Sequence, residues 1–334
     1  MTDIRDEDPS GSAPADGWGS DPTTGDGRRR WSRRRLLTVG LGGAAAVVVD
    51  GVVGLELVAH GDLPGQQTLD RYDGACSVPG TPLDVADPGP SVSGWFFSHA
   101  RNRAVAYTIA YPPGHGPGSS LPLVVMLHGF GGNHASALSG MSPAEAVALR
   151  VDGAPLAPMA LVTVDGGEGY WNPHPGDDPM AMVIDELIPM CQGLGLGRPP
   201  QRIGTMGISM GGYGALLFAE KYPSVVSAVA AISPAVWTSY DQARAANAGA
   251  YASAADFAAD DAVTHAGALA GTPVRVASGD ADPFHAGVEA LAGALPADAV
   301  VEFSTGCHDG AYFVSQEPPS LAFLAGHLTG RRTP

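Results

Sequence analysis

Charged side chains are scarce in this sequence, and positively charged ones are the scarcest. Only 16% of the 334 residues are charged, and 18 Lys and Arg stand against 34 Asp and Glu, so the formal net charge is −16. Seven of the 18 basic residues precede residue 36, which leaves the rest of the chain strongly acidic. Such a surface repels phosphate groups, so we expect no binding to nucleic acid or to other polyanions.

Cysteine is also rare. The three cysteines, Cys76, Cys191 and Cys307, show no metal-ligand spacing, and we expect neither a metal site nor a cofactor. An odd number of cysteines permits at most one internal disulfide, and the sequence does not decide which pair forms it. Three free thiols are the alternative.

The chain lacks an uninterrupted apolar run long enough to form a stable membrane span. Residues 36–49 are uncharged and mostly apolar, but Asp50 and Glu56 interrupt the continuation of this run to residue 59. An acidic side chain near the centre of a bilayer costs about 2.5–3.5 kcal/mol. Hydrophobic residues nevertheless make up 45% of the sequence, which is enough for the core of a globular domain.

The N-terminal part of the chain has the composition of a targeting signal. Residues 1–27 contain almost no large apolar side chains, and we expect them to be disordered. Residues 28–59 begin with a basic cluster, in which Ser32-Arg33-Arg34 precedes Leu36 and Leu37; this order resembles a twin-arginine export signal. We therefore expect recognition by the twin-arginine export machinery and an extracytoplasmic location, either secreted or associated with the cell envelope. Cleavage and loose tethering both remain open.

After a Gly-, Pro- and Asp-rich linker at residues 60–91, the pattern changes to short strands that alternate with amphipathic helices. A hairpin opens this region, and the later strands are continuous apolar runs, as in strands buried on both faces. The predicted strands are residues 94–97, 104–109, 121–127, 159–164, 202–208, 227–232, 274–278 and 299–303, and the clearest helices are 179–191, 211–222, 285–295 and 311–327. This order predicts one α/β domain over residues 92–330, with a mostly parallel central sheet of about eight strands and helices on both faces.

The strongest chemical motif lies where a predicted strand meets a predicted helix. Gly207, Ser209 and Gly211 form the pattern G-x-S-x-G, in which a serine on a sharp turn becomes an exposed nucleophile. Small residues two positions before and after the serine let the strand and helix approach each other. The motif predicts that Ser209 forms a covalent acyl intermediate.

Acyl transfer also needs two N–H donors for the oxyanion, and a base held by an acid. We expect the N–H groups of Met210 and Phe130 to be the donors, with Gly131 as the alternative to Phe130 in the loop after strand 121–127. The loops after the last two strands supply the base His308 and two candidate acids. His128 and His285 are the alternatives for the base. We prefer Asp282 to Asp280, because Pro283 ends the loop and leaves the side chain of Asp282 free to turn inward.

From about residue 92 onward the chain resembles the putative-esterase family of α/β-hydrolases, which includes esterase D (the S-formylglutathione hydrolases), feruloyl esterases and mycolyltransferases. The shared features are His128-Gly129 after a buried strand, Asp165-Gly166 followed by Tyr170-Trp171, Asp185-Glu186-Leu187-Ile188-Pro189, the elbow at residues 207–215, Gly279 with Asp282-Pro283-Phe284, and Gly306 with His308-Asp309. The resemblance implies the α/β-hydrolase fold, the triad Ser209, Asp282 and His308, and the donors Phe130 and Met210.

Two departures narrow what the resemblance implies. Formylglutathione hydrolases are cytosolic, which conflicts with the export signal, and mycolyltransferases usually carry Glu where Asp282 stands.

The substrate remains open at this stage. Residues 166–178 form a long loop whose Tyr170 and Trp171 could wall an acyl or sugar pocket together with His128; alternatively, Trp171 packs the loop onto the domain. We expect an exported serine carboxylesterase that acts on a small ester or on an acylated sugar or lipid. The alternatives are an acyltransferase to a sugar or lipid hydroxyl and a binding protein that kept the fold without catalysis.

Overall fold

The computed structural model describes residue 70, residues 73–80 and residues 82–330. The described residues all lie within the unit Val58–Pro334. The predicted disordered region 1–27 and the twin-arginine-type segment 28–59 lie outside the described residues. Among the described helices, none combines the length and apolar character needed to cross a membrane.

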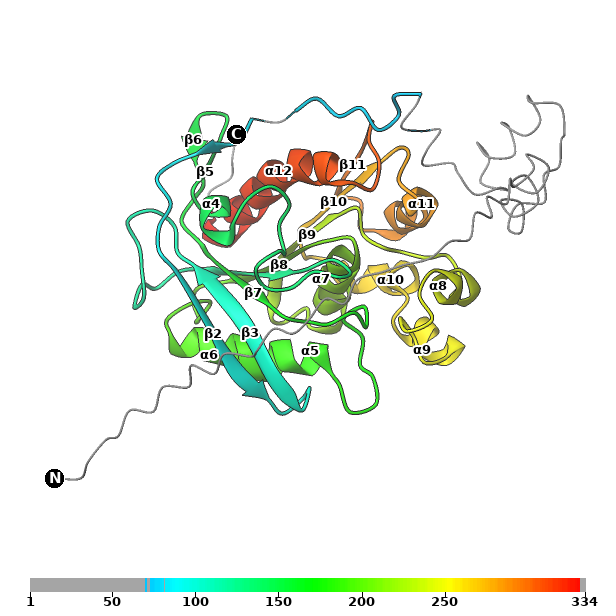
Figure 1. Ribbon diagram of the computed structural model, residues 1–334, viewed down its shortest axis with the longest axis horizontal. Helices are drawn as coiled ribbons and strands as arrows, with labels where there is room; N and C mark the ends of the chain where they lie inside the picture. Colours follow the sequence, from blue (N-terminus) through cyan, green and yellow to red (C-terminus); the bar gives the residue numbers. More distant parts are fainter. Residues whose placement is uncertain (1–69, 71–72, 81, 331–334) are drawn as a thin grey trace, which may run out of the picture. The chain divides into compact units, whose positions relative to one another are not determined.

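One eight-stranded sheet organises the domain, in the order β11-β10-β9-β8-β4-β7-β3-β2 (Figure 1). Its first strands pair antiparallel, β2 with β3 and β3 with β7, and all the later pairs are parallel. The strands are β2 (Ser91–Ser98), β3 (Arg103–Ala110), β4 (Leu123–Leu127), β7 (Ala160–Val164), β8 (Ile203–Ile208), β9 (Val226–Ile232), β10 (Val274–Gly279) and β11 (Val300–Ser304). All eight predicted strands are therefore present, and the predicted α/β-hydrolase architecture is confirmed.

Successive residues of the central strands contribute to two separate hydrophobic cores, because side chains alternate across a sheet. In β4, Leu123, Val125 and Leu127 point into one core, whereas Val124 and Met126 point into the other. Every residue of β4, β7 and β8 is buried. A sheet covered on both faces explains why these strands read as continuous apolar runs.

Two groups of helices cover the sheet (Figure 1). α4 and α12 pack on one face, and α5, α6, α7 and α11 pack on the other. The helical segments are α4 (Pro143–Ala146), α5 (Pro179–Ala181), η1 (Met182–Leu187, a π-helix), α6 (Ile188–Gly193), α7 (Met210–Lys221), α8 (Tyr240–Ala246), α9 (Ala254–Ala259), α10 (Ala262–His265), η2 (Ala266–Leu269), α11 (His285–Ala294) and α12 (Gly310–Thr329).

The sequence did not predict the small second sheet, whose strands are β1 (Asp84–Val85), β5 (Leu149–Val151) and β6 (Ala154–Pro155). β1 comes from the predicted linker and pairs antiparallel with β5. The end of that linker therefore belongs to the folded domain. Strands of two or three residues are too short to show a hydrophobic period, so no pattern marked them.

The parallel strands place four loops at one edge of the sheet. β4, β8, β10 and β11 all run in the same direction, so the loops that follow them emerge at their common carboxyl edge. Open α/β sheets bind ligands at this edge.

Candidate active site

Ser209 occupies the turn between β8 and α7 with a strained backbone, φ 57° and ψ −120°. A residue other than glycine at such a positive φ costs about 1–3 kcal/mol and is kept only where its surroundings hold it. The surroundings here are hydrogen bonds: Ser209 N–H donates to Ile232 O at 2.9 Å, and Ser209 O accepts from Tyr213 N–H and Ala235 N–H, each at 3.0 Å. The turn therefore holds the serine side chain at the carboxyl edge of the sheet.

The two flanking glycines have no room for a side chain. A Cβ on Gly207 would lie 2.0 Å from Gly211 O, and a Cβ on Gly211 would lie 1.9 Å from Leu127 O. The backbone segments around Ser209 therefore lie in direct contact with each other, which confirms that only small residues fit at these two positions.

The loops after β10 and β11 bring a carboxylate and an imidazole to this serine. His308 Nε2 lies 2.8 Å from Ser209 Oγ, and His308 Nδ1 lies 2.9 Å from Asp282 Oδ2. The Asp282 side chain is fully buried, and that of His308 is 19% exposed. Because a carboxylate can only accept, Nδ1 carries a proton and Nε2 is left to accept from the serine hydroxyl.

The alternatives to these residues lie elsewhere. Asp280 is exposed to solvent, whereas Asp282 Oδ1 is fixed by Phe284 N–H at 2.8 Å. His285 Nδ1 hydrogen-bonds to Gly279 O at 3.0 Å, and its Nε2 contacts Glu289. Asp282 is thus the acid that meets His308.

A tight turn after β4 lies beside Ser209. Gly132 N–H donates to Gly129 O at 3.0 Å, and Gly131 has φ 72°, as a type II turn requires at its third residue. A Cβ on Gly129 would lie 3.7 Å from Ser209 Cβ. The turn uses the N–H of its fourth residue only, so the N–H of Phe130 stays available, as does that of Met210 in the first turn of α7.

A pocket of about 340 Å³ opens over these groups. Apolar and hydroxyl side chains line most of it, and His308 is the one ionisable side chain among its described lining residues. The lining residues are Gly129, Phe130, Gly132, Ser136, Ala137, Ser139, Ile208, Ser209, His308 and Phe313.

A serine, histidine and buried aspartate joined in this order, with N–H groups beside the serine, make up the machinery of acyl transfer. The family described as "Putative esterase" matches residues 98–301, more than half of the 334 residues. The chain belongs to this esterase family. It is accordingly a serine hydrolase.

Solved structures share the fold of this esterase at low sequence identity. A ferulic acid esterase has a TM-score of 0.55 and 19% identity, over 72% of this chain and 98% of that one. An S-formylglutathione hydrolase from Agrobacterium tumefaciens gives 0.55 and 19%, over 75% and 100%. The fluorophosphonate-binding serine hydrolase FphF from Staphylococcus aureus gives 0.55 and 15%, over 72% and 99%. A search of curated protein sequences found no match.

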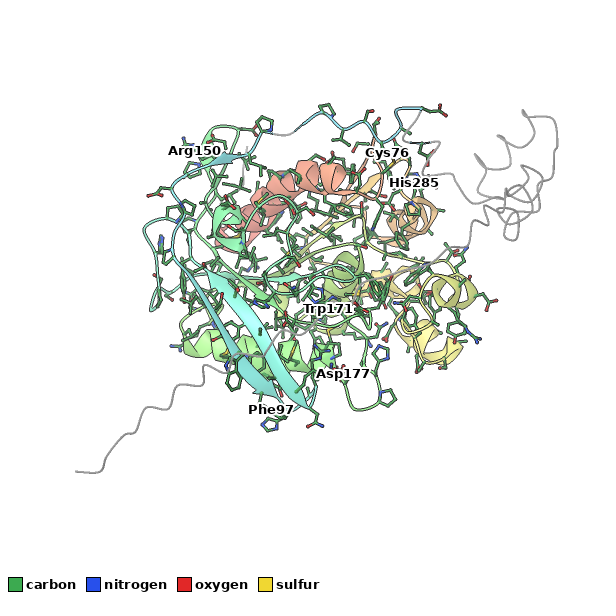
Figure 2. The ribbon with its side chains drawn as sticks, in the orientation of Figure 1. Cys76, Phe97, Arg150, Trp171, Asp177 and His285 are labelled. Carbon is green, nitrogen blue, oxygen red and sulfur yellow. A yellow bond between two sulfur atoms is a disulfide. The ribbon has the colours of Figure 1, made fainter. Side chains whose placement is uncertain are left out.

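The structure corrects the predicted pocket wall of the esterase. Tyr170, Trp171 and His128 are 6%, 1% and 0% exposed, and none of them lines the pocket. Trp171 lies in the interior (Figure 2), where its ring fills the space that a Cβ on Gly166 or Gly214 would enter, at 2.2 and 2.7 Å. Trp171 therefore packs its loop onto the domain, which is the alternative left open for this residue.

His128 instead supports the oxyanion turn of the esterase. Gly166 N–H donates to His128 Nε2 at 2.8 Å, so the ring proton sits on Nδ1, which donates to Gly129 O at 2.8 Å. Burial lowers the pKa of His128, which keeps the imidazole neutral in this arrangement. His128 therefore holds the backbone of Gly129 rather than contacting the substrate.

Sequence reasoning missed two aromatic rings that hold the base. Phe284 and Phe313 each pack against His308 with ring centroids 5.1 Å apart, Phe284 in a tilted and Phe313 in an edge-to-face arrangement. Their positions carried a usable signal, because each lies within five residues of Asp282 or His308. It also missed Ser139 in the pocket wall, whose N–H donates to the buried carboxyl group of Glu317 at 2.5 Å.

The structure also decides the cysteine pairing that the sequence left open. Cys76 and Cys307 form a disulfide across 231 residues of sequence, and Cys191 is a buried free thiol. Cys307 directly precedes His308, so the disulfide anchors the loop that carries the base.

Proposed function

We propose that the protein is an exported carboxylesterase that hydrolyses uncharged esters through an acyl-enzyme on Ser209. The contact of His308 Nε2 with Ser209 Oγ at 2.8 Å supports this proposal most strongly, because it places a general base on the nucleophile.

Each group in the site has a role in this reaction. His308 takes the proton of Ser209 as the hydroxyl attacks the ester carbonyl, and then gives it to the leaving alcohol. Asp282 stabilises the imidazolium that forms between these two transfers. The N–H groups of Phe130 and Met210 stabilise the oxyanion, to which each such donor contributes about 2.7–4 kcal/mol. Water then attacks the acyl-enzyme through the same proton transfers, which releases the acid and restores Ser209.

The pocket favours an uncharged substrate. Its described lining residues include no Lys or Arg to pair with a carboxylate, and the protein carries a net charge of −16. Phe130 is 56% exposed at the pocket and offers an apolar surface to an acyl or alkoxy group. A charged thioester such as S-formylglutathione fits this surface poorly, whereas uncharged alkyl and aryl esters fit it well.

The test combines turnover with active-site labelling. We expect the purified full-length protein to hydrolyse p-nitrophenyl acetate and to react with a fluorophosphonate probe, with both activities lost in Ser209→Ala. The control is Ser224→Ala, which removes an exposed hydroxyl outside the pocket and should keep both turnover and label. A folded wild-type protein with neither turnover nor label would reject the enzymatic proposal in favour of a binding protein.

Acyl transfer to a sugar or lipid hydroxyl uses the same triad and differs only in the acceptor. Adding candidate alcohols to the same assay separates the two reactions. Free acid as the sole product supports the esterase, whereas an acylated alcohol formed at the expense of free acid would support the transferase.

Export is the second part of the proposal and rests on Arg33 and Arg34 before the apolar stretch. We expect residues 1–59 to carry a folded fluorescent reporter across the membrane, and Arg33→Lys/Arg34→Lys to leave it in the cytoplasm. Changing Arg28 and Arg29 to Lys is the matched control and should leave export intact. Equal export by both pairs of variants would contradict a twin-arginine signal.

A further inference from the structure

The oxyanion turn belongs to a longer loop, residues 128–134. Two adjacent residues, Asp165 and Gly166, form hydrogen bonds with the two ends of this loop. Gly166 N–H fixes His128 at the start of this loop. Asp165 fixes its end, because Asp165 Oδ1 accepts from both the backbone N–H and the Nδ1–H of His134, each at 2.8 Å. Both contacts come from the segment directly after β7.

The glycines of the loop explain why it needs holding. Gly129, Gly131 and Gly132 leave the backbone around Phe130 with unusual conformational freedom. An oxyanion donor, in contrast, stabilises the transition state only when it is already in place. Clamps at His128 and His134 would remove that freedom on both sides of Phe130.

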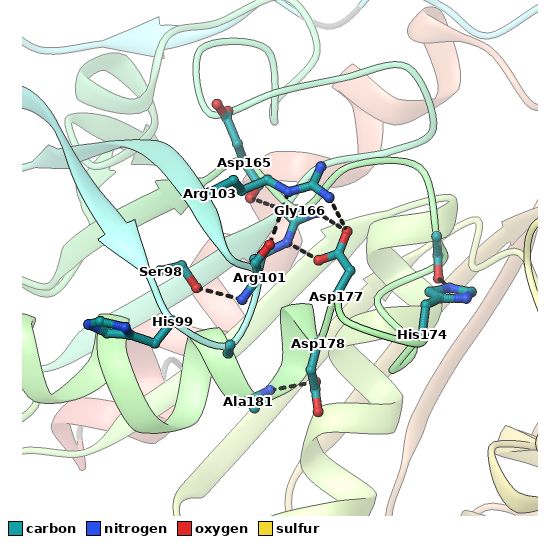
Figure 3. A network of polar contacts seen from close by, with 12 residues as sticks. Ser98, His99, Arg101, Arg103, Asp165, Gly166, His174, Asp177, Asp178 and Ala181 are labelled. Carbon is teal, nitrogen blue, oxygen red and sulfur yellow. Dashed lines mark hydrogen bonds and ion pairs between the residues drawn. The ribbon is translucent and has the colours of Figure 1, made fainter.

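Asp165 is itself held by a buried arginine (Figure 3). Arg101 is 3% exposed, and its Nη1 donates to Asp165 O at 2.7 Å. Its other nitrogens bind Asp177, with Nε at 2.6 Å and Nη2 at 3.1 Å from the two carboxylate oxygens. Paired, bidentate contacts of this kind fix both position and orientation. The chain of contacts thus runs from Asp177 through Arg101 and Asp165 to His134.

We propose that Asp165 is a positioning residue for the oxyanion hole, which holds the Phe130 N–H in place through His134. This inference rests on the proposed function, since the position of a donor affects catalysis only if an oxyanion forms. Asp165 touches neither Ser209 nor His308 in any described contact, so its effect would reach the reaction through the loop alone.

The experiment compares three variants of the full-length protein. Asp165→Ala removes the acceptor, and Asp165→Asn keeps an oxygen that can accept both His134 bonds. Arg103→Ala is the matched control, because Arg103 also binds Asp177, at 3.0 Å, but makes no described contact with Asp165. For each protein we would measure kcat, KM, inhibition by a boronic acid that forms a tetrahedral adduct on Ser209, and hydrogen exchange of residues 128–134.

We expect Asp165→Ala to lower kcat by roughly 10–100-fold with KM within about twofold, because a donor displaced by about 1 Å weakens transition-state binding but not ground-state binding. Boronic acid affinity should fall in parallel, and exchange in residues 128–134 should quicken. Asp165→Asn should recover most of the kcat, and Arg103→Ala should match the wild type throughout.

The outcomes separate this inference from the proposed function. Unchanged exchange in residues 128–134 of Asp165→Ala would overturn the inference, and so would faster exchange with unchanged kcat in an active enzyme. An equal loss in Arg103→Ala would also overturn it, because Arg103 makes no described contact with Asp165 or His134, and the loss would then reflect general disorder around Asp177 and Arg101 rather than the loss of the bonds to His134. If the wild type hydrolyses no ester, the proposed function fails, and hydrogen exchange alone decides whether Asp165 positions the loop.

Discussion

At the scale of single residues, Glu220 is the least compensated group in the described part of the chain. It lies in α7, is 7% exposed, and neither of its side-chain oxygens has a hydrogen-bond partner among the described residues. Burial, together with the nearby Asp261, raises the pKa of Glu220 from 4.5 to about 9, although Lys221 acts in the opposite direction. The folded protein therefore retains a proton that the unfolded chain releases.

This proton makes stability fall as the pH rises. Between pH 4.5 and about 9 the folded state binds more protons at Glu220 than the unfolded state does, so the free energy of unfolding decreases across that window. Glu220→Gln cannot ionise, so its free energy of unfolding should not fall in this window. We therefore expect the stability of Glu220→Gln relative to the wild type to increase from pH 5 to pH 9 by at least about 1.4 kcal/mol, the equivalent of one pKa unit. Urea unfolding at both pH values measures the difference.

The control for this prediction is Glu168→Gln, which removes an exposed carboxylate and should leave the pH dependence unchanged. Parallel stability curves for Glu220→Gln and the wild type would show that Glu220 is already ionised, or hydrated, in the folded protein.

The residues that sequence reasoning found and those it misplaced differ in whether the sequence marks their backbone conformation. The G-x-S-x-G motif marks the positive φ of Ser209, whereas no motif marks that of Tyr170 and Trp171. Ser209, Asp282 and His308 were predictable because each follows a strand, and the fold brings those strand ends together. Tyr170 and Trp171 were placed in the pocket wall, yet they have φ of 56° and 60°. Two consecutive bulky residues in this region are rare, and no pattern in the sequence announces them. That turn directs the Trp171 ring inward.

At the scale of elements, the positions of strands and helices along the sequence were largely predictable, but how closely a helix packs against a strand was not. The hydrophobic period locates β4 and α7 to within two residues. It does not reveal that Gly211 brings the helix against the last carbonyl of β4, or that η1 widens into a π-helix. Such close approaches depend on tertiary contacts rather than on local propensity.

Gly211→Ala tests this approach. An alanine in a helix is favoured over glycine by about 1 kcal/mol, but its Cβ would lie 1.9 Å from Leu127 O. Backbone cannot yield as a flexible side chain does, and overpacking costs about 1–3 kcal/mol or more. The clash therefore outweighs the propensity, and we expect a lower urea midpoint together with loss of turnover, because Ser209 and the oxyanion turn would move apart.

A matched glycine separates the clash from the propensity. Gly293 lies in α11 with nothing within 4 Å of an added Cβ, so Gly293→Ala should be neutral or stabilising by up to about 1 kcal/mol with full activity. If Gly211→Ala behaved in the same way, the contact of α7 with β4 would be looser than described.

At the scale of the whole molecule, the disulfide closes a loop that contains almost the entire domain. Cys76 and Cys307 are 231 residues apart, and a cross-link over so long a loop restricts the unfolded chain strongly, by roughly 5 kcal/mol in the chain-entropy model. Because the sequence held three cysteines and no spacing rule, only the fold could choose this pair. Measured effects of disulfides are usually smaller, about 2–4 kcal/mol.

We therefore expect Cys76→Ser/Cys307→Ser to lower the free energy of unfolding by about 2–4 kcal/mol, and dithiothreitol to lower the melting temperature of the wild type but not of this variant. Because Cys307 adjoins His308, kcat should fall with the bond even at temperatures where the domain stays folded. Cys191→Ala, which removes the buried free thiol, should keep its response to dithiothreitol. A double variant with wild-type stability and kcat would mean that α12 and the aromatic rings around His308 hold the base loop without the disulfide.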